Sequence, residues 1–141
     1  MAFWKSAILG ALCCAATGAA AQVTTYDCDM NSLEGRGFIT ERMIFTVDTA
    51  RNVAAVVDGI VMAVYDKPVA ATFEQLSNGQ YRLKWQVRNL KSGANSFNVD
   101  YRIQFRPNDQ SLSIRANLRG FDNRPIGSGT CKIVPGQSLL N

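Results

Sequence analysis

Three basic residues, Lys84, Arg102 and Arg115, offer the clearest chemistry in the sequence. Each lies on the polar side of a segment in which polar and apolar residues alternate, as they do in half-buried strands. A turn at 107–110 and a loop at 89–96 would pair these segments so that the three cations form one row. Like charges that face each other across strands cost roughly a few tenths of a kcal/mol. The row therefore predicts an anion-binding face.

The same row has a plainer and more common interpretation, a solvated outer face that discourages aggregation. If the face is functional, the expected partner is an anionic component of the cell envelope or an acidic protein, because opposite charges attract. Nucleic acid is not an expected partner. The aromatic residues of these segments point to the opposite side, which leaves no platform on which bases could stack.

Two cysteines, Cys28 and Cys131, stand near the two ends of the expected mature chain. In exported proteins a single pair of cysteines commonly forms a disulfide. The sequence predicts such a bond here, joining the first and last strands. Closing a loop of about 100 residues is worth roughly 4.7 kcal/mol in the chain-entropy treatment. The alternative is a pair of free thiols.

Residues 1–21 have the features of a secretory signal peptide. A lysine is followed by an apolar run at 7–16 and by the small residues Ala19-Ala20-Ala21, where cleavage is expected. The apolar run is shorter than the roughly 20 residues that a transmembrane helix needs. A lipid-modified cysteine at Cys13 or Cys14 is the other alternative. We expect cleavage and a periplasmic or secreted protein, with no transmembrane segment after the signal is removed.

The sequence contains no histidine. This removes the commonest general base at neutral pH, the Ser–His and Cys–His nucleophile pairs and the commonest metal ligand. The spacing Asp27-x-Asp29-x-Asn31 is similar to the start of a calcium loop, but Ser32 and Phe38 stand where an EF-hand needs glycine and a bidentate acid. The sequence therefore predicts a protein that is not an enzyme and that uses no cofactor and no metal.

Glycine-rich segments at 120–125 and 127–130 could bind anions through backbone N–H groups. They lack the spacing of a phosphate-binding loop and lead into a strand instead of a helix. We interpret them as a flexible or bulged entry to the last strand.

Alternation extends through most of residues 22–134 and predicts one all-β domain. We expect a small antiparallel barrel or sandwich of about eight strands, closed by the disulfide, and no helix. Asp58-Gly59 predicts a tight turn that leads into a strand at 60–65. Residues 135–141 are expected to form a flexible tail. Bulky inward aromatic residues should fill the interior: Tyr81, Trp85, Phe97, Tyr101 and Phe105.

Three short motifs carry a resemblance: Tyr26-Asp27-Cys28, Gly120-Phe121-Asp122-Asn123 and Gly127-Ser128-Gly129-Thr130-Cys131. With these motifs the chain resembles an uncharacterised family of small exported bacterial β-proteins, which implies export and a β fold but no known activity. A weaker likeness connects it to the small β-barrel inhibitors of c-type lysozyme, which also begin near a Tyr-x-Cys. The serine and tyrosine–lysine loop motifs of those inhibitors are not evident. Like charge would also slow the encounter of this basic chain with a basic lysozyme.

Together these features predict an exported, non-enzymatic β domain. It would act as a binding or structural accessory protein of the cell envelope through its basic sheet face. The alternatives are an inhibitor or modulator of an envelope hydrolase and an enzyme of unfamiliar type, because a fold alone does not decide between them.

Overall fold

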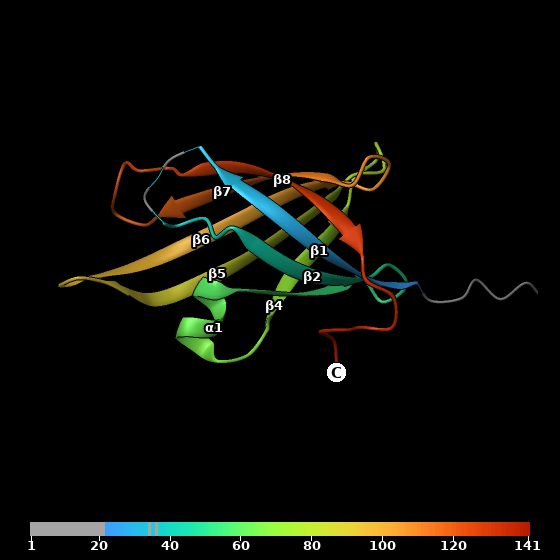
Figure 1. The fold of residues 1–141 in the computed structure, drawn as a ribbon, viewed down its shortest axis with the longest axis horizontal. Coiled ribbons are helices and arrows are strands. Elements are labelled where there is room, and N and C mark those ends of the chain that lie inside the picture. The colour runs from blue at the N-terminus through green and yellow to red at the C-terminus, as the bar shows by residue number, and fades with distance from the viewer. Residues whose placement is uncertain (1–21, 34, 36) are drawn as a thin grey trace, which may run out of the picture.

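The structure is a computed structural model that describes residues 22–33, 35 and 37–141. Within these residues the chain forms eight strands and one short helix (Figure 1). The strands are β1 (Val23–Ser32), β2 (Arg42–Asp48), β3 (Val53–Asp58), β4 (Val69–Gln75), β5 (Tyr81–Ser92), β6 (Asn95–Arg106), β7 (Ser111–Leu118) and β8 (Ile126–Ile133), and the helix is α1 (Gly59–Tyr65). The signal peptide predicted at 1–21 lies outside the described residues.

Each strand pairs antiparallel with the next, and β8 pairs with β1, so the sheet closes into a barrel. The predicted all-β antiparallel fold is confirmed, and of its two alternatives the barrel is the correct one. In the described part of the chain, no helix is both long enough and apolar enough to span a bilayer.

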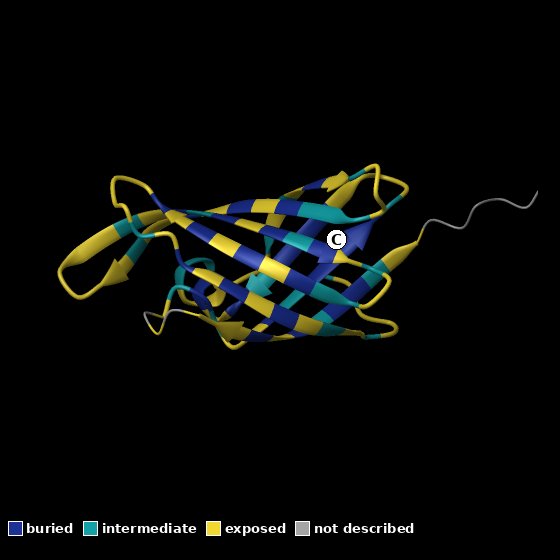
Figure 2. Ribbon diagram, turned by 90° about the horizontal axis from the view of Figure 1, so that it is seen from above, coloured by how far each residue is buried: buried dark blue, intermediate teal, exposed yellow. Residues whose placement is uncertain are grey.

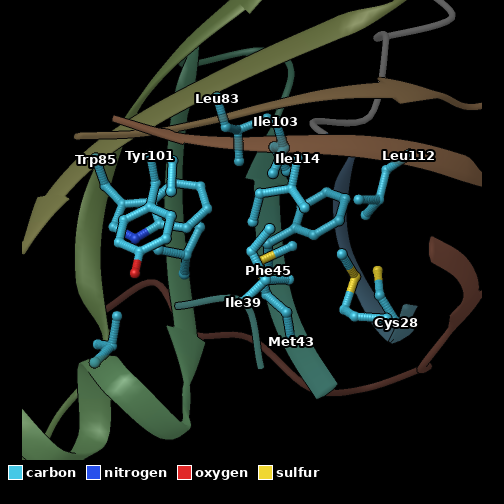
Figure 3. Packing of buried hydrophobic residues seen from close by; sticks show 14 of the residues in the cluster. Cys28, Ile39, Met43, Phe45, Leu83, Trp85, Tyr101, Ile103, Leu112 and Ile114 are labelled. Carbon is cyan, nitrogen blue, oxygen red and sulfur yellow. The ribbon is translucent and has the colours of Figure 1, made fainter. Parts of the chain in front are cut away.

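The interior of the barrel is packed with side chains from alternate positions of every strand, which gives the banded burial pattern of Figure 2. Near one end Trp85 stacks on Tyr101 with ring centroids 5.2 Å apart (Figure 3). Further along, Phe105 contacts the rings of Tyr26 and Phe45, with centroids 4.5 and 5.2 Å away. Of the five aromatic residues expected inside, three are buried, and the other two, Tyr81 and Phe97, are half-buried against the core. The prediction of a filled interior is thus confirmed.

The disulfide joins Cys28 to Cys131, which face each other in the β1–β8 ladder. This confirms the predicted closure of the first strand on the last. Gly127 and Gly129 of β8 also lie close to β1. A Cβ at Gly127 would lie 2.7 Å from the backbone oxygen of Asn31, and one at Gly129 would lie 2.6 Å from the sulfur of Met30. The Gly-x-Gly pattern of β8 therefore lets the two strands pack together.

The strand expected at 60–65 is wrong, because these residues form α1. Asp58 does not lead into a hairpin. Its carboxylate accepts a hydrogen bond from the N–H of Val61 at 2.7 Å and caps the first turn. At the other end Asp66 adopts a left-handed conformation, and its N–H donates to Met62 O at 2.9 Å. Ile60 and Val61 are buried against the core, so caps and packing outweigh the strand preference of these β-branched residues.

The tail at 135–141 hydrogen bonds to the outer side of β1 and β2, where we expected a flexible segment (Figure 1). The Thr25 hydroxyl donates to Gln137 O at 2.6 Å, and the N–H of Leu139 donates to the Thr46 hydroxyl at 3.0 Å. The two hydroxyl oxygens are 2.7 Å apart. Both threonines are buried on a side of the strand that would otherwise face solvent.

Candidate functional site: a basic groove across five strands

The three predicted cations lie in one row across the barrel wall. Lys84 on β5 faces Arg102 on β6, and Arg102 faces Arg115 on β7. The turn at 107–110 sets residue 106 opposite residue 111, as predicted. A bulge after Val87 shifts the β5–β6 register, but it lies beyond Lys84 and leaves the pairing of the row unchanged. The predicted juxtaposition, called the basic row below, is confirmed.

The basic row faces outward because its neighbours along each strand are buried. The residues directly before and after each cation belong to the core. They are Leu83 and Trp85 around Lys84, Tyr101 and Ile103 around Arg102, and Ile114 and Ala116 around Arg115. All three cations are exposed. The row continues at both ends, to Thr72 on β4 and to Ile126 on β8.

A second row runs beside the first, one pleat further along the strands. Gln86 faces Asp100, and Asp100 faces Asn117. We call these three residues the polar row. The two rows line a groove with a volume of about 820 Å³ on the outer side of the sheet. Arg88 and Arg124 also line it. Five cations and a single carboxylate therefore contribute to one hollow.

The carboxylate in the groove is already engaged. Asp100 accepts two hydrogen bonds from Arg119, at 2.8 and 3.1 Å. Because this pair is bidentate, Arg119 compensates the charge of Asp100. Arg88 donates to the side-chain oxygen of Gln86 at 2.9 Å.

Several arginines elsewhere on the barrel have acidic partners, whereas Lys67, Lys91 and Lys132 have no carboxylate within ion-pair distance among the described residues. Arg42 pairs with Asp27 at 2.7 Å, Arg51 with Asp48 at 2.6 Å and Arg82 with Glu74 at 3.2 Å. Arg106 lies 3.8 Å from Asp109. Among the residues that the structure describes, by contrast, no carboxylate lies within ion-pair distance of the basic row or of Arg124. Positive charge in the groove is thus left without compensation by the described part of the protein.

The Asp27-x-Asp29-x-Asn31 motif lies on the outer side of β1. The Arg42 guanidinium donates hydrogen bonds to both carboxylate oxygens of Asp27, at 2.9 and 2.7 Å. These bonds lower the pKa of the Asp27 carboxyl below its ordinary value. Within the described residues, no group of three potential metal-ligating side chains converges. Asp27 therefore serves an ion pair with the neighbouring strand.

A second group of polar atoms lies inside the barrel, at the end that α1 covers. Burial raises the pKa of Asp58 above its ordinary value, although hydrogen bonds from Val61, Ile60 and Thr40 oppose the shift. Burial also raises the pKa of Tyr101, whose hydroxyl donates to Phe38 O at 2.8 Å. These groups are engaged in capping and packing, so the arrangement is structural.

Alternation alone indicated the outward position of the polar row, but not its role. Arg124 was missed because it lies in the loop before β8, where no periodicity fixes its direction. The hollow itself depends on the twist and coiling of the whole sheet, which a local sequence pattern does not encode.

Comparison with known proteins identifies no relative: no family model, no curated protein and no solved structure matches the chain. The two resemblances drawn from short motifs therefore stay predictions.

Proposed function

We propose that the protein binds an anionic ligand in the basic groove and acts by binding instead of by catalysis. One observation carries the proposal: three cations on adjacent strands line one groove, and the described residues provide them with no carboxylate partner. Facing like charges cost roughly a few tenths of a kcal/mol per pair. An anion seated among them would turn this repulsion into attraction.

The packed interior supports a binding site on the outer side of the barrel. Rings and aliphatic side chains fill the inside, so a ligand would compete with the core for that space. The groove, in contrast, is open to solvent and lined by groups that bind anions strongly. Arginine guanidinium groups match carboxylate, sulfate and phosphate in a bidentate geometry.

We further propose that the protein works outside the cytoplasm, in the periplasm or after secretion. The disulfide suits an oxidising compartment, and residues 1–21 have the pattern of a signal peptide. The ligand would then be an anionic component of the cell envelope or its surroundings. A hollow favours a ligand that enters it over a flat bilayer surface.

Inhibition of an envelope hydrolase is the second candidate function, and the β5–β6 hairpin favours it. The hairpin, whose last strand pair is Ser92 with Asn95, projects beyond the barrel (Figures 1 and 2). A protruding loop of this kind can enter the cleft of a partner. The tip is already a two-residue turn at Gly93-Ala94, so the test shortens the hairpin: replacing residues 91–96 with an Asn-Gly turn keeps the Leu90–Phe97 pair and removes the projecting end. This variant should lose inhibition if this candidate is correct, and should leave anion binding in the groove unchanged.

The proposed function is tested by titrating the purified protein with a panel of anions in low and high salt. The panel is inorganic tripolyphosphate, a short oligogalacturonate and vesicles that contain phosphatidylglycerol. At least one probe should bind in low salt and bind more weakly in high salt, since exposed charges are screened over about 10 Å at 0.1 M.

Arg102→Gln should weaken that binding about tenfold, because it removes one charge-assisted contact. Arg106→Gln is the matched control. Arg106 lies on the same strand and the same outer side, but it sits beside Asp109 and does not line the groove. The proposal is wrong if no probe binds in low salt, or if the two variants lose affinity equally.

A further inference from the structure

The groove has the dimensions of a site for a single extended chain. It reaches from Thr72 on β4 to Ile126 on β8. Neighbouring strands are about 4.8 Å apart, so the four intervals between five strands amount to about 19 Å along the curved sheet. Its two rows are two residues apart along each strand, which corresponds to about 7 Å. A ligand of this shape would lie across the strands.

The two long sides of the groove differ in chemistry. The basic row presents only donors and positive charge. The polar row presents donors and acceptors together: the amides of Gln86 and Asn117 and the carboxylate of Asp100. Although Arg119 binds both oxygens of Asp100, each oxygen has a further lone pair that can accept a hydrogen bond. A matching ligand therefore has an anionic edge and an edge that both donates and accepts hydrogen bonds.

On this basis we propose that the ligand is a linear acidic oligosaccharide, an inference that rests on the proposed function. Its anionic groups would face the basic row, and its hydroxyl groups would face the polar row. Hydroxyl groups can donate to Asp100 and to the amide oxygens, and can accept from the amide N–H groups. A bare polyphosphate offers acceptors alone and cannot donate a hydrogen bond to Asp100 or to the amide oxygens of the polar row.

Other extended anions fit less well. Trp85 and Tyr101 stack on each other inside the barrel and are almost completely buried, so their rings offer no platform for the bases of a single-stranded nucleic acid. Peptides commonly bind by adding a strand to a free sheet edge. Along the basic row each strand is paired with the next, from Thr72 on β4 to Ile126 on β8, so the strands present no such edge in this part of the groove.

The test compares the affinities of three ligands and measures how substitutions in the basic row and in the polar row change them. The full-length purified protein is titrated with oligogalacturonate, with inorganic tripolyphosphate and with an oligoglutamate peptide of matched charge. Asn117→Ala shortens a side chain of the polar row that makes no hydrogen bond or ion pair within the described protein, so the fold should be unaffected. Ser113→Ala is its control, because Ser113 is exposed on the same strand and lies outside the groove.

We expect oligogalacturonate to bind most tightly of the three probes. Arg102→Gln should weaken the binding of both oligogalacturonate and tripolyphosphate about tenfold. Asn117→Ala should weaken oligogalacturonate about threefold or more and leave tripolyphosphate unchanged, while Ser113→Ala should change neither.

The glycan inference is overturned if tripolyphosphate or oligoglutamate binds as tightly as oligogalacturonate, or if Asn117→Ala has no effect on the glycan. In both cases the anion-binding function stands as long as Arg102→Gln weakens binding. If no probe binds in low salt, the proposed function fails together with the inference.

Discussion

Two parts of the same barrel wall use outward-facing residues in opposite ways. On the outer side of β1 and β2, which we call the covered wall, the C-terminal tail hydrogen bonds to Thr25 and Thr46, and Arg42 is paired with Asp27. On the outer side of β5, β6 and β7, the open wall, the basic row is exposed and has no acidic partner among the described residues. Polar and apolar residues alternate in both walls. The outward polar groups named above have partners within the protein on the covered wall, whereas the basic row on the open wall has no acidic partner among the described residues.

The hydrogen bonds on the covered wall form a continuous chain with a fixed direction. Gln137 O can only accept, so the Thr25 hydroxyl proton is committed to it. The contact between the two threonine hydroxyls must then use the proton of Thr46. Thr46 in turn accepts from the N–H of Leu139. Every polar group in this chain of hydrogen bonds is satisfied within the protein, so the covered wall contributes to stability.

The largest expected effect concerns the disulfide that ties β1, at the covered wall, to β8. Cys28→Ser should lower the free energy of unfolding by about 2–5 kcal/mol, as is typical for disulfides of small exported domains. Urea denaturation under non-reducing conditions measures the loss, and peptide mapping of the unreduced wild type should find the linked pair. A loss below about 1 kcal/mol would contradict the role assigned to the closure.

Gly129→Ala tests the close approach of β8 to β1. The new Cβ would lie 2.6 Å from the sulfur of Met30 and 2.8 Å from the backbone oxygen of Asp29. Because the backbone oxygen cannot rotate away, we expect a loss of about 1–3 kcal/mol, the usual cost of overpacking. Gly35→Ala is the control, since no described residue lies within 4 Å of its Cβ position. Equal stability of the two variants in thermal unfolding would refute the packing explanation.

Thr46→Val breaks the covered wall directly. The substitution leaves the N–H of Leu139 and the oxygen of Thr25 without their partner, which should cost about 1–2 kcal/mol. Thr72→Val, at an exposed position next to the open wall, should stay within about 0.5 kcal/mol of wild type. Hydrogen exchange of the Leu139 amide should rise in the first variant only. If the two variants are equally stable, the two walls do not differ as we describe.

A pH-dependent effect is expected at Asp58, under α1. Its pKa is raised in the folded protein by burial, so the folded state holds the proton more tightly than the unfolded state does. The stability of the wild type should therefore fall as the pH rises from about 3.8 through the folded-state pKa. Asp58→Asn keeps an N-capping side chain without the charge. Its stability relative to wild type should increase over this pH range, and a constant difference would argue against the raised pKa.

The smallest expected change in the free energy of unfolding is the most direct test of the difference between the two walls. Arg102→Gln should raise the free energy of unfolding in low salt by roughly a few tenths of a kcal/mol, because it removes repulsion from two facing cations. Arg42→Gln should lower it, because Asp27 loses its partner. Both differences should shrink in high salt. Two changes of the same sign would mean that the open wall is no less satisfied than the covered one.

The sequence was sufficient for the antiparallel all-β fold and the basic row, because alternation and turns are local patterns, and for the disulfide, because the expected mature chain has a single pair of cysteines. It left the choice between barrel and sandwich open, since closure pairs two strands that are distant in the sequence. Alternation fixes which side a residue faces, and the turn at 107–110 fixes the register that sets Arg102 opposite Arg115. Helix α1 was missed because a run of β-branched residues favours a strand locally, whereas the Asp58 cap and burial of Ile60 decide the outcome. The tail was missed because its partners are distant threonines. The groove was missed because its depth depends on the curvature of the whole sheet.

Closure of the barrel through β1 and β8 sets the order in which folding can finish. All other strand pairs join neighbours in the sequence, but this pair joins residues that are 103 positions apart. Such contacts form late, because they require the loss of entropy of a long loop. Until β8 is available, one edge of β1 has no strand partner and Cys28 remains a free thiol. The edge of β1 is therefore paired, and the sulfurs of Cys28 and Cys131 meet, only once β8 has been added to the sheet.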